Sequence, residues 1–158
     1  RVLIVFLIGL FLICLSACQS PRERFQSETQ NVLNQIPAPD GTNLVCLEYL
    51  ERLAKQGIGT SFGVAATYGT NWSYDDIAEQ YRSQLTEQGW LQYGHTTWEQ
   101  PLYCNPQYQG IIIEVSMLSS EIQCENSSSV TADDPDFRTF YILVVRKFPY
   151  DDIGGCQD

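Results

Sequence analysis

Cysteine thiols are the side chains of this sequence best suited to covalent or metal chemistry. Four of the six cysteines lie in the body of the chain, separated by 58, 20 and 32 residues. Zinc sites and redox dithiols are built on closely spaced pairs such as Cys-x-x-Cys, a spacing that does not occur here. We therefore expect no metal site. In a small exported domain an even number of cysteines indicates two structural disulfides, here formed by Cys46, Cys104, Cys124 and Cys156.

Hydrolysis has little support in the sequence. The single histidine, His95, lies in no motif that would place a nucleophile and an orienting third group beside it. We expect His95 on the surface, and we predict no catalytic residue and no cofactor. A pair of acids of the kind that glycosidases use could still form, because sequence spacing does not give the separation of carboxyl groups. The candidates are Glu99, Glu114, Asp75 and Asp76.

Acidic residues outnumber basic ones in this chain of 158 residues, with 19 against 9 and a net charge of −10. The acidic run Asp133, Asp134 and Asp136 lacks the alternating ligands, central Gly and closing Glu of a calcium loop, so a solvated turn is expected. Nucleic-acid binding needs a basic face, and only Arg146 and Lys147 are adjacent basic residues. The charge excludes nucleic acid as a partner, and it disfavours docking on anionic lipid by charge alone.

The N-terminus has the pattern of an export signal. Arg1 precedes an uncharged apolar run of 14 residues, and the small residues Ser16 and Ala17 follow. This run is too short to cross a hydrocarbon core of about 30 Å at about 1.5 Å per residue. A basic start, an apolar middle and a small-residue end predict a signal peptide over residues 1–17.

The four residues Leu15-Ser16-Ala17-Cys18 sharpen this prediction because they resemble the lipobox of bacterial lipoproteins. The resemblance implies cleavage between Ala17 and Cys18, and a diacylglycerol thioether with an added fatty acid on Cys18. Two or three acyl chains would hold the protein firmly on a membrane, on the extracytoplasmic side of the bacterial cell envelope. The alternatives are cleavage near Ala17 by the ordinary signal peptidase, and an uncleaved anchor.

Residues 18–42 are polar and contain three prolines, which indicates a flexible tether behind the lipidated cysteine. Such a tether would reach roughly 25–30 Å. Within it, Phe25, Thr29, Val32 and Ile36 recur at helical spacing, so residues 21–36 form either a short amphipathic helix or a solvated spacer. We place a single domain at residues 43–158.

The clearest structural signal in the domain is a strand followed by a helix. Apolar residues alternate from Phe62 to Tyr68, which is the period of a half-buried strand. Ser73 is a good N-cap, an apolar stripe at helical spacing follows, and Gly89 suits the C-terminal cap before a strand that begins at Trp90. The stripe consists of Ile77, Tyr81 and Leu85.

This string of residues, from Tyr68 and Ser73 to Gly89-Trp90, resembles a strand–helix–strand module of small bacterial envelope lipoproteins of unknown function. The resemblance spans about residues 43–148 and implies one helix across a curled antiparallel sheet. The resemblance implies no particular activity for this chain.

Two further strands are predicted at residues 111–118 and 140–146, because both runs are rich in β-branched residues. Residues 44–53 have helical propensity, but the hairpin-like connection that follows favours a strand. We therefore expect an α+β domain, with one helix packed on a curled antiparallel sheet of about four to five strands and two disulfides. Antiparallel pairing of the last two strands would bring Cys156 towards Cys104, which leaves Cys46 to pair with Cys124.

Aromatic residues gather between positions 93 and 108, at Tyr93, Trp98, Tyr103 and Tyr108. They form either a recognition patch for a protein or sugar polymer, or part of the cover of the sheet. We expect a membrane-anchored lipoprotein that acts without catalysis, as a binding or assembly module for an envelope protein or polymer. The rival expectations are a small envelope hydrolase whose site is not visible in sequence, and an inhibitor of an extracellular enzyme.

Overall fold

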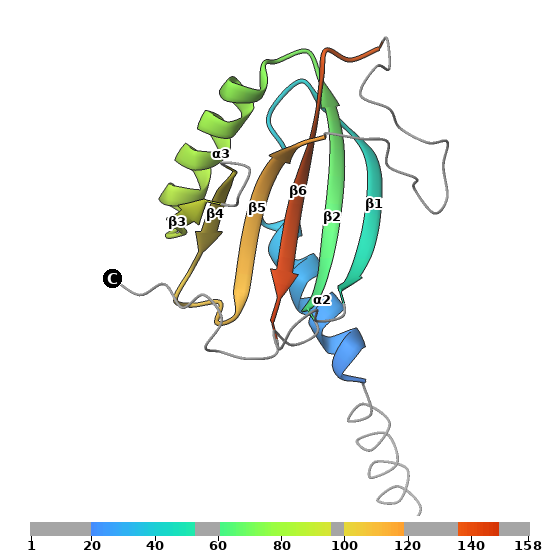
Figure 1. Cartoon of the computed structure of the whole chain (residues 1–158), viewed down its shortest axis with the longest axis vertical. Helices are drawn as coiled ribbons and strands as arrows, with labels where there is room; N and C mark the ends of the chain where they lie inside the picture. The colour runs from blue at the N-terminus through green and yellow to red at the C-terminus, as the bar shows by residue number, and fades with distance from the viewer. Residues whose placement is uncertain (1–19, 53–60, 96–99, 119–135, 149–158) are drawn as a thin grey trace, which may run out of the picture.

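The fold is a six-stranded antiparallel sheet with two helices, seen in a computed structural model that describes residues 20–52, 61–95, 100–118 and 136–148 (Figure 1). The elements follow the chain in the order α2 (Pro21–Asn34), β1 (Thr42–Arg52), β2 (Ser61–Thr70), α3 (Tyr74–Glu87), β3 (Leu91–His95), β4 (Pro101–Cys104), β5 (Ile111–Met117) and β6 (Thr139–Lys147).

The strands lie in the order β1-β2-β6-β5-β4-β3, and all neighbours are antiparallel. The central pair, β2 and β6, stays in register from Phe62 opposite Lys147 to Thr70 opposite Thr139. The last strand of the chain is thus inserted between β2 and β5. A register shift between Leu44 and Cys46 marks a bulge in β1, the edge strand beside β2.

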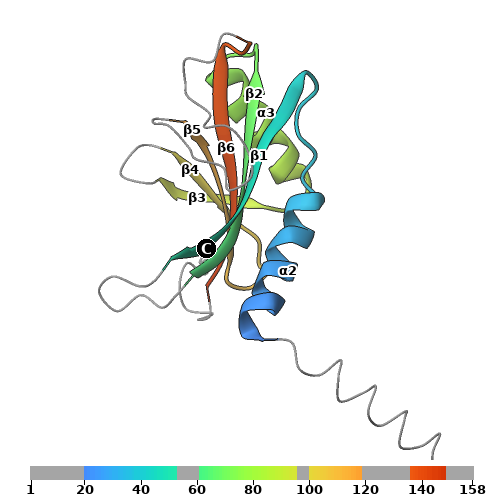
Figure 2. The same cartoon turned by 90° about the vertical axis from the view of Figure 1, so that its right-hand side faces the viewer.

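Both helices pack on the same face of the sheet (Figure 2). α2 contributes Val32 and Leu33 to the main core, and α3 contributes Tyr81 and Leu85. The core between helices and sheet also contains alternate residues of the strands, as expected from the period of two along a strand: Val64, Ala66, Tyr103, Ile111, Ile113, Val115, Tyr141, Leu143 and Val145.

The predicted helix after β2 is confirmed as α3. The Ser73 hydroxyl accepts a hydrogen bond from the Asp76 backbone N–H at 3.2 Å, and Gly89 ends the helix with a φ of 82°. The three stripe residues of α3 are completely buried. β2, β5 and β6 also match their predicted runs. Residues 44–52 lie in β1, which confirms the prediction of a strand rather than a helix for this segment.

The predicted count of one helix and four to five strands is wrong, because the described residues alone form two helices and six strands. The additional helix is α2, in the segment that we interpreted as a tether or a short helix. Proline is a breaker inside a helix but is favoured in the first turn, where Pro21 lies, because the N–H it lacks would have no partner there. The short strand β4 begins at Pro101, and a first strand position tolerates proline.

The two disulfides of the expected fold are not part of the described structure, since no two described cysteines lie at bonding distance. Cys46 is buried in β1 and Cys104 is buried in β4, on strands separated by three others. Their predicted partners, Cys124 and Cys156, lie outside the described residues.

Candidate functional site

The structure describes the side chains of two of the four aromatic residues of the predicted recognition patch, Tyr103 and Tyr108. Tyr103 points into the main core and is 1% exposed, where burial raises its pKa. Tyr108 is half-buried between β4 and β5. The side chain of Tyr93 and the whole of Trp98 lie outside the described residues. Of the two described side chains, Tyr108 borders a cavity, whereas Tyr103 lies in the core.

Those predicted acid candidates that the structure describes lie at the start of α3 or in an ion pair on the sheet. Asp76 accepts a hydrogen bond from the Ser73 hydroxyl at 2.5 Å at the start of α3, and Asp75 is exposed in the same turn. Glu114 lies 3.9 Å from the Arg146 guanidinium on the sheet. Glu99, Asp133, Asp134, Cys18 and the side chain of His95 lie outside the described residues.

A hollow lies between α2, the connection from β4 to β5 and the end of β6. Its volume is about 390 Å³, within the range of roughly 300–1,000 Å³ that is usual for small-molecule sites. Three segments far apart in the sequence form its walls: Glu28, Asn31, Val32 and Gln35 from α2, Gln107, Tyr108, Gln109 and Ile111 from the connection and β5, and Lys147 from β6.

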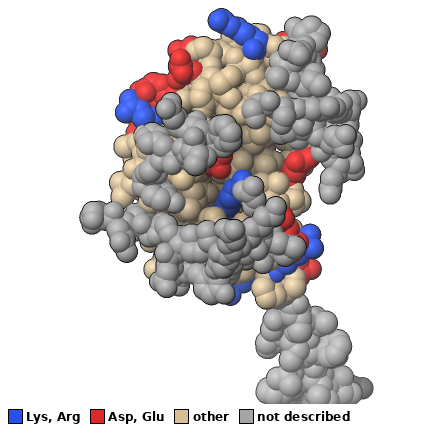
Figure 3. All heavy atoms as spheres, in the orientation of Figure 1, with Lys and Arg blue, Asp and Glu red and all other residues tan. Residues whose placement is uncertain are grey.

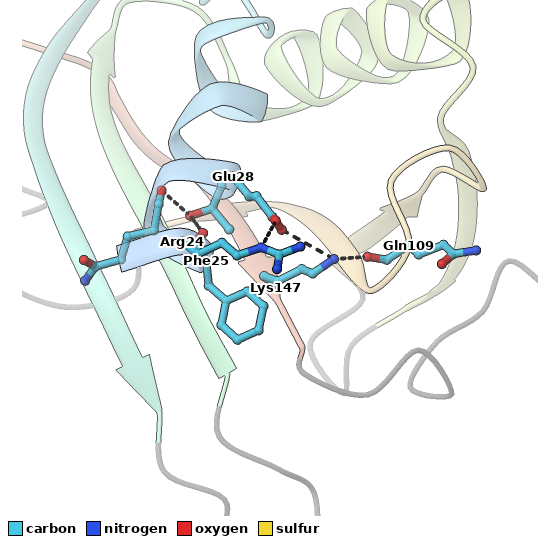
Figure 4. Close-up of polar contacts among 7 residues, drawn as sticks. Arg24, Phe25, Glu28, Gln109 and Lys147 are labelled. Atoms are coloured by element: carbon cyan, nitrogen blue, oxygen red, sulfur yellow. Dashed lines mark hydrogen bonds and ion pairs between the residues drawn. The ribbon is translucent and has the colours of Figure 1, made fainter. Parts of the chain in front are cut away.

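An ion-pair network fixes one wall of this hollow (Figure 4). The Lys147 ammonium lies 3.6 Å from the Glu28 carboxylate and donates to the backbone carbonyl of Gln109. The other oxygen of Glu28 accepts a hydrogen bond from Arg24 Nε at 3.1 Å. The Lys147 side chain is only 16% exposed, so its stem is packed while its charge is shared between two acceptors.

The opposite wall is fixed by an aromatic stack. The Tyr108 ring lies parallel to the Trp90 ring, with 5.3 Å between centroids and 4° between planes. The Tyr108 hydroxyl donates to Gln35 Oε1 at 3.0 Å, and Gln88 Nε2 donates to the Gln35 backbone carbonyl at 3.2 Å. Tyr108 and Gln35 therefore join α2 to the β4–β5 connection across the hollow.

The chemistry of the hollow is polar but balanced in charge. Among the lining residues, Glu28 and Lys147 are the charged pair, and they face each other. The floor is apolar, because Val32 and Ile111 are buried. The rim is rich in side-chain amides, each of which can both donate and accept hydrogen bonds, at Asn31, Gln35, Gln107 and Gln109.

Sequence reasoning did not find most of this site. It named Tyr108 as a recognition residue and Lys147 only as one of two adjacent basic residues. The helical face of α2 could have been found from two signals: the Ser20-x-x-Glu23 capping box, and the polar residues Glu28, Asn31 and Gln35 at helical spacing.

Comparison with protein-family models, curated proteins and solved structures gives no match to this chain. None of the helices in the described ranges is both long and apolar enough to cross a membrane. Across the same ranges, no three histidine, cysteine, aspartate or glutamate side chains are grouped so as to hold a metal ion.

Proposed function

We propose that this protein is a non-catalytic binding module, held on a membrane of the bacterial cell envelope by acylated Cys18. Its hollow receives an uncharged, hydroxyl-rich ligand, such as a sugar unit of an envelope polymer. The observation that carries the proposal is the hollow itself, with an amide rim, an apolar floor and no net charge among its lining residues.

The internal pairing of Glu28 with Lys147 supports a neutral ligand. A charged ligand would have to compete with this pair, which is already completed by Arg24 and by the Gln109 carbonyl. Hydroxyl groups match the amides of the rim, because both kinds of group donate and accept hydrogen bonds. The C–H faces of a sugar ring are apolar and suit a floor of Val32 and Ile111.

The anchored location is supported by the sequence of the N-terminus. The 14-residue apolar run and Leu15-Ser16-Ala17-Cys18 together carry this part of the proposal. The hollow lies on the domain that follows, so the lipid supplies location and the hollow supplies recognition.

The test is an NMR titration of the soluble domain, residues 20–158, with uncharged disaccharides and with soluble peptidoglycan fragments. We expect shifts of the side-chain amides of the hollow and of the Lys147 backbone. The double variant Gln107→Ala with Gln109→Ala should lose most of the binding, because it removes two amides while keeping the Gln109 carbonyl that holds Lys147. Gln92→Ala is the matched control, since Gln92 is an exposed amide on β3 away from the hollow.

Two results would contradict the proposal. One is the absence of specific shifts with any of these sugars. The other is equal binding by the double variant and by the Gln92→Ala control.

A further inference from the structure

α2 begins almost immediately behind the predicted lipidation site. Ser20 is the N-cap of α2, and a single residue, Gln19, separates it from Cys18. A complete capping box fixes this start: the Ser20 hydroxyl accepts from the Glu23 N–H at 3.3 Å, and the Glu23 carboxylate accepts from the Ser20 N–H at 2.9 Å. The helix therefore begins at a defined residue.

α2 is joined to the sheet from its first turns onward. Arg22 lies 3.2 Å from Glu51 at the end of β1, and the Phe25 ring stacks on Phe62 of β2 with 5.6 Å between centroids. Further along, Thr29, Val32, Leu33 and Ile36 are buried. A helix held along its whole length moves with the domain, so these 14 residues give the domain no freedom relative to the chain before Ser20.

The start of α2 lies at one end of the sheet, which we call the base. The base comprises the first two turns of α2, the ends of β1 and β6 and the start of β2, where Arg52 pairs with Ser61 and Phe62 with Lys147. Figures 1 and 2 show α2 rising along the sheet from this end. The opposite end, the top, contains the starts of β1 and β6 with the residues just before them, the end of β2 and the first turn of α3.

The described charges differ between the two ends. The base holds four of the six basic residues whose side chains are described, with three acidic ones, whereas the top holds one basic residue with four acidic ones. Figure 3 shows Lys and Arg atoms beside Asp and Glu atoms at the lower right of the domain, and another group of Lys or Arg atoms at its top. The base contains Arg22, Arg24, Arg146, Lys147, Glu23, Glu28 and Glu51, and the top contains Arg138, Asp40, Asp75, Asp76 and Asp136.

We propose that the base of the domain rests on the lipid headgroups, so that the strands of the sheet stand away from the membrane. This inference rests on the proposed acylation of Cys18. Two residues of extended chain span at most about 7 Å, which keeps Ser20 close to the acylated cysteine. A flexible tether of residues 18–42 would instead have reached roughly 25–30 Å.

The charge distribution suits this orientation without driving it. An acidic protein is repelled by an anionic leaflet, and the base is the less acidic of the two ends among the described residues. In this orientation the hollow lies close to the membrane. Glu28 lies eight residues along α2 from Ser20, a rise of about 12 Å, so the hollow faces the layer just above the headgroups.

The experiment places one fluorophore near the base and one at the top of the acylated full-length protein. Ser27→Cys lies on an exposed position of α2, and Asn71→Cys lies on an exposed position just after β2. Each labelled protein is reconstituted in phosphatidylethanolamine and phosphatidylglycerol vesicles that contain lipids with a nitroxide on the headgroup. Quenching should be roughly threefold or more stronger at position 27, because the two positions differ in height by about 20 Å.

A spacer variant and a flotation assay complete the test. Insertion of about twelve Gly and Ser residues between Gln19 and Ser20 gives a reach of about 20 Å and should remove most of the difference. Equal quenching at both positions in protein that floats with the vesicles would overturn the orientation and leave the anchor standing. Protein that does not float with the vesicles would overturn the anchor, and the orientation with it.

Discussion

Lys147, the last residue of β6, lies 3.6 Å from Glu28 on the second turn of α2, and this pair joins α2 to a central strand of the sheet. The ammonium also donates to the Gln109 carbonyl, so Lys147 links three segments around the hollow: β6, α2 and the connection from β4 to β5. Its side chain is 16% exposed, which limits the solvent screening that weakens most surface ion pairs.

Lys147→Met should therefore destabilise the domain by roughly 1–2 kcal/mol, because one oxygen of the partly covered Glu28 carboxylate and the Gln109 carbonyl both lose the Lys147 ammonium. Urea unfolding followed by tryptophan fluorescence measures the loss. Arg82→Met is the matched control: it breaks the pair with Glu79, in which both side chains are largely exposed, and should have the smaller effect. An equal or larger loss in the control would show that the Lys147 network is not structural.

Leu33→Ala tests whether α2 is part of the fold. Leu33 is 5% exposed in the main core, so the variant should lose about 2–4 kcal/mol, as truncation of a buried leucine does elsewhere. A solvated spacer would tolerate the same change. The exposed neighbour Asn34 provides the control, since Asn34→Ala keeps the helix and buries nothing new. Similar unfolding midpoints for the two variants would mean that α2 is not packed in solution.

Some elements could be predicted from the sequence because their signals are local. α3 has its N-cap, its apolar stripe and its glycine cap within seventeen residues, and these fix both ends of the helix. β5 and β6 are uninterrupted β-branched runs. For β1 the local signal was mixed, and pairing with β2 along its length decides in favour of the strand.

The remaining features depend on contacts that the sequence does not display. The apolar face of α2 is short, and one of its buried residues, Thr29, is polar. The helical spacing was therefore a weak signal, and the prolines of this segment supported a spacer equally well. β4 has only four residues and begins with a proline. The hollow combines residues from Glu28 to Lys147, and only the insertion of β6 between β2 and β5 brings these positions together.

Gly63→Ala should lower the stability of the fold, although it adds only one methyl group. A Cβ at this position of β2 would lie 2.6 Å from the Val145 backbone carbonyl, and a backbone atom in a central strand has little room to move. We expect a loss of about 1–3 kcal/mol, as for other overpacked positions. Gly89→Ala is the comparison, because there the change adds strain at a φ of 82° but meets its nearest atom only at 3.7 Å. The prediction is contradicted if Gly63→Ala unfolds at the same urea concentration as the unchanged protein.

Alkaline pH should weaken the fold through its buried tyrosines. Burial raises the pKa of Tyr74 to about 12, helped by nearby Tyr103 and Glu114, and burial also raises the pKa values of Tyr81 and Tyr141 above 10. The unfolded chain then releases protons that the folded chain retains, so stability should be level below about pH 9.5 and should fall as pH rises through 10 towards 12.

Urea unfolding at a series of pH values, with tyrosinate absorbance in parallel, measures this effect. Tyr74→Phe should reduce the slope above pH 10, since a phenylalanine has no proton to lose. A slope that is unchanged in Tyr74→Phe, Tyr81→Phe and Tyr141→Phe would assign the alkaline transition to other groups.

Tyr108→Phe should affect binding in the hollow more than it affects stability. The ring can keep its stack on Trp90, so packing is retained, while Gln35 loses the donor that orients its amide. The lost hydrogen bond is exposed, and we expect a stability change below about 1 kcal/mol but a weakening of sugar binding of roughly three- to tenfold. Tyr74→Phe is the converse control, because it removes a 2.9 Å bond to the Val115 carbonyl away from the hollow and should lower stability without changing binding. Titration calorimetry measures the binding affinity of both variants, and urea unfolding measures their stability. Loss of binding in Tyr74→Phe but not in Tyr108→Phe would move the recognition site away from α2.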